Sequence, residues 1–464
     1  MSERGERRER YDAGQWRYTA VADVAITVFD GPFGSNLKTS DYTSEGVRVM
    51  RLENIGHLRL FSDKEAYVSL GKYEGLKRHT LEPNDILFSS FIDDKIRVCL
   101  FPGLPTIAIN KSDCFCIRVD LSRCSPQFLM YRLACRSTFE QLEATVHGAT
   151  RPRISLSQLK ATEFGLPPLP AQRRIVAKID SLSAKSKRAR DHLDHIPRLV
   201  EKYKQAILAA AFRGELTREW RSAHGANGVR WSECCLADIA EGGTGSTPKR
   251  GEPRYYEGGN IPWVTSGAVN ASLILEAEEF ITEVALSETN CKIFPSGTLL
   301  MAMYGEGQTR GRVAVLGIDA ATNQALAAIR VRPESNAVLD FVFWYLRGNY
   351  LELRQKAAGG VQPNLNLGII KTLRLPVPSD REQREIVRRI ENAFAWIDRL
   401  ATEAKSARKL IEHLDQAVLA KAFRGELVPQ DPNDEPASVL QERIIAERQS
   451  KPGKAPRESR RTAN

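Results

Sequence analysis

The chain carries one segment twice. Residues 205–216 read QAILAAAFRGEL and residues 416–427 read QAVLAKAFRGEL, so ten of twelve positions are identical at an offset of 211 residues. The similarity continues backwards to QRRIVAKID at 172–180 and QREIVRRIE at 383–391. A repeat with so long a period indicates duplicated domains rather than a solenoid of short units.

Each copy of the repeat places mostly apolar residues at alternating steps of four and three. A period of 3.5 that is held for about five heptads is typical of a coiled coil. The first helix would run from the first domain to the second, and the second helix can run back in the opposite direction beside it. We therefore predict an antiparallel pair. Two ordinary amphipathic helices, each buried against its own neighbour, are the alternative. The predicted seam is Ile175, Ile179, Leu182, Ser186, Ala189, Leu193, Ile196, Val200, Tyr203, Ile207 and Ala210 in the first copy, and Ile386, Ile390, Ala393, Ile397, Leu400, Ala404, Ala407, Ile411, Leu414, Val418 and Lys421 in the second.

Prolines and glycines mark where these helices begin, break and end. A proline-rich segment introduces each copy and suits the first helical turn, where a missing N–H costs nothing. Gly214 and Gly425 follow the last periodic residues and are predicted to be C-cap glycines. Pro197 lies inside the first seam and predicts a kink or break near Asp194. Its counterpart is Arg408, so the second helix is predicted to run without a break.

Two regions of similar organisation surround the helices, and both contain short β-rich runs separated by Gly, Pro and Asn turns. Helical spacing follows at 128–137 in the first region and at 341–356 in the second. We predict an α+β fold: two similar mixed α/β domains separated by two long antiparallel coiled-coil helices, with approximate two-fold symmetry. The predicted boundaries are 11–170 for the first domain, 171–216 for the first helix, 217–228 for a linker, 229–378 for the second domain, 379–427 for the second helix, and 428–464 for a linker, a short helix and a basic tail.

Composition favours a reader of an anionic partner over an enzyme. The 464 residues carry a formal net charge of +10, which favours such a partner without specifying a fold. No apolar run approaches the ~18 residues of a membrane span, and the first ten residues lack the apolar core of a signal peptide, so we expect a cytoplasmic protein. The eight cysteines lack zinc-site spacing, and phosphate-loop, nucleophile-elbow and metalloprotease motifs are absent. We therefore predict neither a catalytic residue nor a metal site.

Glycine-rich and basic loops are the candidates for contact with an anionic partner, DNA among them. In the second domain, residues 304–312 (YGEGQTRGR) follow an apolar run at 298–303. Glycines allow close approach to a ligand, glutamine suits adenine, and arginine suits guanine or phosphate. The alternative is a tight turn whose arginines only touch phosphates. The candidate residues are Tyr304, Gln308, Thr309, Arg310 and Arg312, with Thr265, Ser266 and Asn270 expected beside them; in the first domain they are Lys95 and Arg97 in the corresponding stretch 89–97, and Arg151 and Arg153 in a later polar loop.

The duplicated motifs resemble the specificity subunit of type I restriction–modification systems. The carrying motifs are LPPLPAQRRIV with QAILAAAFRGELT, and LPVPSDREQREIV with QAVLAKAFRGELV. The resemblance implies a subunit without a catalytic site, whose two target-recognition domains each read one half of a bipartite DNA sequence. It also implies that the helices dock two methyltransferase subunits that use S-adenosylmethionine. Motor–nuclease subunits, which use ATP and Mg, would join them in the full complex. Pro197 departs mildly from coiled-coil design.

The repeated helix ends are the candidate docking segments for those methyltransferase subunits. Their near identity exceeds what a coiled-coil seam requires, although a structural cap that closes each helix would also explain it. A coiled-coil adaptor that binds proteins and not DNA remains a competing class. A third class is a single enzyme that combines DNA recognition and catalysis in one chain. The candidate partner-binding residues are Gln205, Phe212, Arg213 and Glu215 in the first copy, and Gln416, Phe423, Arg424 and Glu426 in the second.

Overall fold

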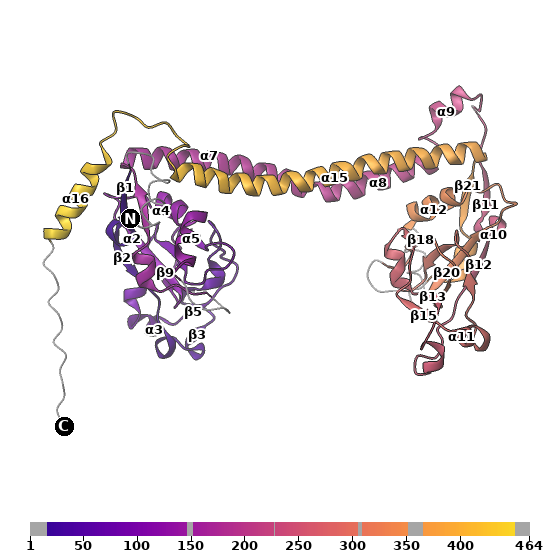
Figure 1. Cartoon of the computed structure of the whole chain (residues 1–464), viewed down its shortest axis with the longest axis horizontal. Coiled ribbons are helices and arrows are strands. Elements are labelled where there is room, and N and C mark those ends of the chain that lie inside the picture. Colours follow the sequence, from indigo (N-terminus) through magenta and orange to yellow (C-terminus); the bar gives the residue numbers. More distant parts are fainter. Residues whose placement is uncertain (1–15, 146–151, 227, 305–308, 351–364, 451–464) are drawn as a thin grey trace, which may run out of the picture. The chain divides into compact units, whose positions relative to one another are not determined.

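A computed structural model describes residues 16–145, 152–226, 228–304, 309–350 and 365–450. The chain divides into two compact units. Unit 1 comprises Met1–Leu193 with Ser406–Asn464, and unit 2 comprises Asp194–Lys405. Each unit therefore holds one mixed α/β domain together with segments from both copies of the repeated helix (Figure 1).

The domain of unit 1 is built on two four-stranded sheets, with strand orders β2-β9-β6-β7 and β3-β5-β4-β8, and a two-stranded ribbon β1-β10. Pairing is antiparallel except between β4 and β8, which run parallel. The strands are β1 (Arg17–Ala20), β2 (Ala25–Phe29), β3 (Tyr42–Thr43), β4 (Val47–Met50), β5 (Tyr67–Val68), β6 (Ile86–Ser89), β7 (Val98–Leu100), β8 (Ala108–Asn110), β9 (Cys114–Val119) and β10 (Glu163–Leu166). The helices of this domain are α2 (Val21–Val24), α3 (Leu70–Glu74), α4 (Pro126–Leu133), α5 (Arg136–Glu143) and α6 (Leu156–Lys160).

The domain of unit 2 has a similar topology, with a fifth strand in its first sheet and a different edge strand in its second. Its sheets have the orders β12-β20-β17-β18-β14 and β15-β13-β19-β16, and β11 pairs with β21 in a ribbon. The strands are β11 (Ser232–Cys235), β12 (Ala240–Thr244), β13 (Ile261–Val264), β14 (Leu273–Ile274), β15 (Glu279–Ile281), β16 (Ile293–Phe294), β17 (Leu299–Ala302), β18 (Val313–Leu316), β19 (Ala320–Thr322), β20 (Leu326–Val331) and β21 (Arg374–Val377). The helices are α9 (Arg218–Ala223), α10 (Leu236–Ile239), α11 (Glu283–Glu288), α12 (Leu339–Gly348) and α14 (Leu367–Lys371).

Long helices complete both units, and within each unit they pair antiparallel, as predicted. In unit 1, α7 (Leu169–Asp194) lies beside the C-terminal part of α15 (Asp380–Phe423), and Ile179 shares a core with Val418. In unit 2, α8 (Ile196–Phe212) lies beside the N-terminal part of α15, and Ile390 shares a core with Ile207 (Figure 1). One interhelical ion pair per unit agrees with this direction: Arg190 with Asp415 in unit 1, and Lys204 with Asp398 in unit 2.

The predicted break in the first helix is confirmed. α7 ends at Asp194 and α8 begins at Ile196, with Pro197 in its first turn, where the missing N–H leaves no helical hydrogen bond unmade. α15 carries Arg408 at the equivalent position and continues unbroken for 44 residues.

The predicted seam is wrong at Tyr203, Leu400, Leu414 and Lys421, all of which are exposed. Leu208 and Ala211, outside the predicted seam, are instead buried in the core that the unit 2 domain supplies. The reason is that each long helix packs against two neighbours, the other long helix and a domain. Part of its apolar surface is therefore buried against the domain and not against the other helix.

The C-terminal segment contains the short helix predicted at 437–448, observed as α16 (Ala437–Ser450). Its Leu440 and Ile444 are buried in the core of unit 1, and Glu447 forms an ion pair with Arg123. All eight cysteines are free thiols. Among the described residues, none of the helices is long and apolar enough to cross a membrane.

Candidate nucleic-acid interface and helix ends

The glycine-rich loop of unit 2 connects two buried strands of one hairpin. β17 and β18 pair antiparallel, and all four residues of β17 are buried. Close to β18 the chain turns back tightly, because the Gly311 N–H donates to the Ala302 carbonyl at 2.8 Å and Gly311 has a φ of +85°. That dihedral favours glycine. A rigid strand therefore presents this loop, as the sequence indicated, although residues 305–308, including Gln308, lie outside the described residues.

Several of the candidate residues in unit 2 come together beside this hairpin. The guanidinium of Arg312 donates to the side-chain carbonyl of Asn270 at 2.9 Å. Asn270 ends a 3-10 turn, Ser266–Asn270, for which Thr265 is the N-cap residue. Tyr304 is exposed, and Thr309 and Arg310 are half-buried. The hairpin and the turn after β13 thus form one polar surface, which the sequence suggested only by proximity to apolar runs.

The hairpin of unit 1, formed by β6 and β7, has the same backbone register as the β17–β18 hairpin of unit 2. The Ser89 N–H donates to the Arg97 carbonyl at 2.9 Å, and the Ala302 N–H donates to the Arg312 carbonyl at 3.0 Å. Arg97 therefore occupies the backbone position of Arg312, but its side chain pairs with Asp93 at 3.1 Å. Lys95 is exposed at the tip of the connection.

The later polar loop of unit 1 lies against this hairpin. The Ile92 N–H donates to the Pro152 carbonyl at 3.1 Å, and the Ile154 N–H donates to the Ser90 carbonyl at 2.9 Å. Between them, the Arg153 guanidinium lies 4.7 Å from the centre of the Phe91 ring. Arg151 lies outside the described residues.

In unit 2 the equivalent of the bond from Ile154 to Ser90 is formed by the Leu365 N–H, which donates to the Met303 carbonyl at 3.1 Å. Hairpin and second loop therefore meet in both domains. Sequence reasoning identified the two loops separately and did not predict this contact.

Arg153 also joins a group of carboxylates under the unit 1 loops. It forms an ion pair with Asp113 at 2.6 Å, and the Asp113 N–H donates to Asp30 at 3.0 Å. Burial raises the pKa of Asp30 to about 6, with a further increase from the nearby Asp113 charge, while two backbone N–H donors and Arg153 act against it. Basic and acidic groups are thus interleaved at this edge, so the surface is not uniformly positive.

Two glycines that the sequence reading did not single out allow a close backbone contact next to these surfaces. A Cβ on Gly31 would lie 2.1 Å from the Lys111 carbonyl carbon, and a Cβ on Gly245 would lie 1.7 Å from the Thr322 carbonyl oxygen. Any side chain at either position would displace the end of β8 or β19. The sequence feature that could have identified them is a glycine that follows the first long strand of each domain.

The repeated glutamine at the start of each long helix is a second feature that sequence reasoning missed. The Gln172 amide donates to the Pro167 and Arg123 carbonyls and accepts from the Ser125 N–H. Gln383 repeats all three bonds with Pro378, Asn336 and Val338. Both glutamines have no exposed surface. Each one ties its long helix to the segment that precedes α4 or α12, so it positions the domain on the helix.

The repeated ends of the helices close with the same hydrogen-bond pattern. The Glu215 N–H donates to Ala210 and the Gly214 N–H to Ala211, and Glu426 and Gly425 repeat this one copy later. This is a Schellman motif. Gly214 and Gly425 have φ of +72° and +75°, so both predicted C-cap glycines are confirmed.

The remaining candidate partner-binding residues divide into inward and outward groups. Phe212 packs edge-on against Phe341 and Tyr345, and Phe423 packs against Phe128, so both phenylalanines serve the cores of their own units. Gln205 and Gln416 are half-buried. The outward group is two ion pairs, Arg213 with Glu215 and Arg424 with Glu426, each at 2.8 Å and solvent-exposed. Exposed pairs contribute little to stability, so folding alone does not explain why both copies keep them.

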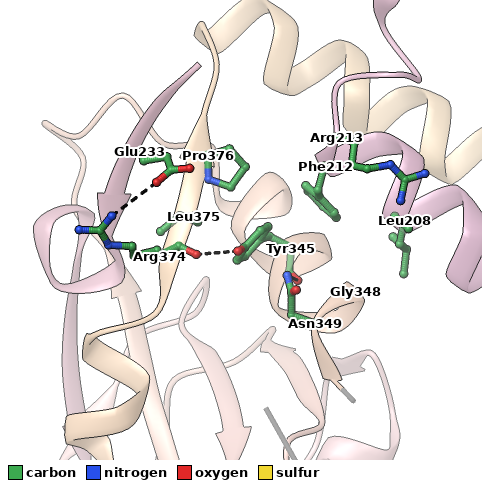
Figure 2. A pocket seen from close by; sticks show the side chains of 11 residues that line it. Leu208, Phe212, Arg213, Glu233, Tyr345, Gly348, Asn349, Arg374, Leu375 and Pro376 are labelled. Atoms are coloured by element: carbon green, nitrogen blue, oxygen red, sulfur yellow. Dashed lines mark hydrogen bonds and ion pairs between the residues drawn. The ribbon is translucent and has the colours of Figure 1, made fainter. Parts of the chain in front are cut away.

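A cavity of about 390 Å³ opens beside the helix end in unit 2. Phe212 and Tyr345 contribute aromatic surface to it, and Arg213 and Arg374 contribute guanidinium groups (Figure 2). Tyr345 donates to the Arg374 carbonyl at 2.6 Å, which fixes the ring between α12 and β21. Among the described residues, no cluster of His, Cys, Asp or Glu could hold a metal ion.

The fold defines a tandem protein with two domains of similar topology. Each domain presents a hairpin and a second loop together, and a buried glutamine ties each one to the paired long helices. Comparison with known proteins agrees with this class. The family described as type I restriction modification DNA specificity domain matches residues 80–195 and 228–407. The chain belongs to this family of specificity subunits.

Similar proteins span most of the chain. The EcoBI specificity subunit of Escherichia coli is 26% identical over 453 residues, covering 91% of this chain and 90% of the relative. The StySPI specificity subunit of Salmonella potsdam is 27% identical over 348 residues, covering 71% and 73%. The crystal structure of the HsdS subunit from Thermoanaerobacter tengcongensis has a TM-score of 0.60 at 21% identity and covers 89% of this chain and 97% of that one. That likeness supports the fold.

Proposed function

We propose that each domain reads one half of an asymmetric, bipartite DNA site, and that the long helices fix the unread spacer between the halves. The observation that carries this proposal is the matched surface in the two units, where a hairpin and a second loop meet with the same backbone register. Two similar readers suit duplex DNA because its backbone has two-fold symmetry, and dimeric DNA-binding proteins use the same match.

Differences in side chains at matched positions favour two different half-sites. Arg97 and Arg312 stand at one register position, but Arg97 is held by the carboxylate of Asp93 and Arg312 by the amide of Asn270. The partner of Arg97 is a charged carboxylate, whereas that of Arg312 is a neutral amide. Base edges are distinguished by patterns of donors and acceptors, so these surfaces favour different sequences.

The helix ends are the proposed docking segments for one methyltransferase subunit each. Their exposed Arg–Glu pairs are kept in both copies although the Schellman motif needs only the glycine. In this proposal S-adenosylmethionine belongs to the methyltransferase subunits, and ATP with Mg belongs to motor–nuclease subunits of the full complex. The role of this chain is to position those subunits on the DNA.

Mapping methylated adenines in cells that carry this chain with its methyltransferase tests the bipartite reading. We expect one asymmetric two-part motif with a fixed spacer. Gln308→Ala or Arg310→Ala should each cost ~1–3 kcal/mol at one base position of one half-site. Arg230→Ala, at an exposed residue in the segment before β11, is the control. A uniform loss over all sequences with a shallower salt dependence would mean phosphate contact only and would contradict base reading by this loop.

Binding to random duplex DNA at several salt concentrations separates this function from a protein-binding adaptor. Neutralised phosphates release counterions, so the logarithm of affinity should fall steeply with the logarithm of salt. A flat dependence, or no binding at low salt, would favour the adaptor.

A further inference from the structure

One carboxylate joins the hairpin and the second loop of the unit 1 domain. Asp113 lies in the turn between β8 and β9, and its side chain is mostly buried. Its Oδ1 accepts a hydrogen bond from the Ser90 hydroxyl of the hairpin at 3.2 Å, and its Oδ2 forms the ion pair with Arg153 of the second loop at 2.6 Å. The Ser90 N–H also donates to the Asp113 backbone carbonyl at 2.9 Å. Asp113 therefore ties both loops to one turn.

The backbone of Asp113 is held in a conformation that side chains rarely adopt. Its φ is +71°, and among the described residues only Leu58 and Asn84 are other non-glycine residues with a positive φ. Such strain persists where the surroundings fix it, and it is concentrated at binding sites. The Asp113 N–H donates to the carboxylate of Asp30 at 3.0 Å, which also accepts from the Gly31 N–H at 2.7 Å. Glycine or asparagine would also suit this dihedral, so the turn alone does not require a carboxylate.

The carboxylate of Asp113 and an aromatic ring together hold the guanidinium of Arg153. Arg153 pairs with Phe91 of the hairpin in an isolated antiparallel bridge, and its guanidinium carbon lies 4.7 Å from the centre of the Phe91 ring. The ion pair and the ring contact restrict the orientation of this long side chain before any ligand arrives. Ordering a side chain in advance lowers the entropy cost of binding.

Half of the Arg153 side chain is nevertheless exposed. A guanidinium has five N–H donors in a rigid fork, and the ion pair engages one of its two terminal nitrogens. An arginine of fixed orientation with exposed donors suits the two acceptors, N7 and O6, that guanine presents in the major groove. A phosphate can be bound by lysine as a simple point charge, so phosphate contact alone does not require this support.

The unit 2 domain keeps the backbone of this arrangement and replaces its side chains. The Met303 N–H donates to the Ala325 carbonyl at 2.8 Å, so Met303 and Ala325 stand where unit 1 has Ser90 and Asp113. Neither side chain carries a hydroxyl or a carboxylate. The supporting carboxylate is therefore a feature of one domain and not of the shared fold.

We propose that Arg153 reads a guanine in the half-site of unit 1 and that Asp113 is the positioning residue that orients it. This inference rests on the proposed function for the reading of a half-site. It adds the base, the residue that contacts the base, and the carboxylate that acts through that residue. The half-site of unit 2 should be insensitive to changes at either residue.

Selection from a pool of randomised duplexes by the full chain in complex with its methyltransferase subunit, with sequencing of the bound DNA, tests the guanine. One bidentate contact provides roughly 5- to 150-fold discrimination, and we expect Arg153→Lys to lose at least about fivefold at one guanine of the unit 1 half-site. Lysine keeps the charge and lacks the planar fork. The matched control is Arg136→Lys, because Arg136 also lies over a phenylalanine ring, 4.4 Å from the centre of Phe139, and pairs with a carboxylate, Glu140, at 3.2 Å. It should leave every preference unchanged.

Asp113→Asn separates positioning from charge and from stability. Asparagine tolerates the dihedral and keeps an acceptor for Ser90, but it removes the charge that holds Arg153. The preference for the same guanine should fall by at least about twofold, since residues in one network are coupled, while affinity for random duplex DNA should not fall. Added to Arg153→Lys, Asp113→Asn should reduce the preference no further, because Asp113 acts only through Arg153. Thermal unfolding checks that each variant is folded.

The possible outcomes distinguish this inference from the proposed function. Additive losses in the double variant, or a uniform change over all sequences in Asp113→Asn, would overturn the positioning role. An unchanged preference at every base in Arg153→Lys would refute guanine reading by Arg153 and leave the proposed function standing. A complex of the unaltered chain that selects no sequence at all would remove both.

Discussion

At the scale of single residues, comparing the two copies separates residues that the fold requires from residues that differ between the two proposed DNA-reading surfaces. Gln172 and Gln383 keep the same three hydrogen bonds in both units. Around the hairpins the backbone register is kept, but Asp113 in unit 1 stands where unit 2 has Ala325. The backbone carbonyl of each accepts from the N–H of the first residue after the strand, which is Ser90 in unit 1 and Met303 in unit 2. Identical side chains therefore mark how a domain is fixed to its helix, and different ones mark the surface proposed to read DNA.

Replacing either glutamine should destabilise its own unit. Gln383→Ala or Gln172→Ala removes a buried amide and leaves two carbonyls and one N–H without their partner, which we expect to cost roughly 2–4 kcal/mol in the free energy of unfolding. Chemical denaturation followed by circular dichroism measures this. Arg381→Ala and Arg173→Ala, exposed neighbours on the same helices, should change stability by less than about 0.5 kcal/mol. Equal effects of the buried and exposed changes would contradict the positioning role of the glutamines.

At the scale of elements, sequence periodicity predicted the long helices, the order of helices and domains along the chain predicted their antiparallel pairing, and Pro197 predicted the break. Periodicity failed at Tyr203 and Leu414 because it identifies apolar positions without telling which neighbour covers them. The strands were predictable as β-rich runs. The meeting of hairpin and second loop was not, since a hydrogen bond such as Ile154 to Ser90 joins residues that are far apart in the sequence. Side-chain partners such as Asn270 for Arg312 were foreseen only as neighbours.

The helix end of unit 2 gives a test with a matched control. Gly214 and Gly225 both have positive φ, at +72° and +67°, so alanine is strained at either position. A Cβ on Gly214 would also lie 3.0 Å from the Arg221 guanidinium and 3.2 Å from the Trp231 ring, whereas one on Gly225 meets nothing within 4 Å. Gly225→Ala should cost about 1 kcal/mol from the backbone alone, and Gly214→Ala should cost clearly more. The comparison is made by thermal unfolding, and a Gly214→Ala variant no less stable than Gly225→Ala would contradict the crowding at the cap.

At the scale of the whole molecule, the proposed function makes the long helices a ruler, and their length can be changed without changing the readers. Inserting one heptad into α8 after Val200 and another into α15 after Ala401 keeps the period of 3.5, so the helices can still pair. Both insertions lie at the level of the ion pair between Lys204 and Asp398, and the loops of the two domains are untouched.

Seven added residues lengthen a helix by about 10 Å at ~1.5 Å per residue, which matches about three base pairs at ~3.4 Å each. We therefore expect adenine mapping to show both half-sites unchanged and the spacer longer by about three base pairs. Affinity should fall, because three base pairs also rotate one half-site by roughly 100° around a duplex that repeats every ~10.5 base pairs. The same seven residues inserted after Gly225, outside the helices, should leave the spacer as it was. A variant that recognises different bases at the original spacing would show that the helices do not set the distance.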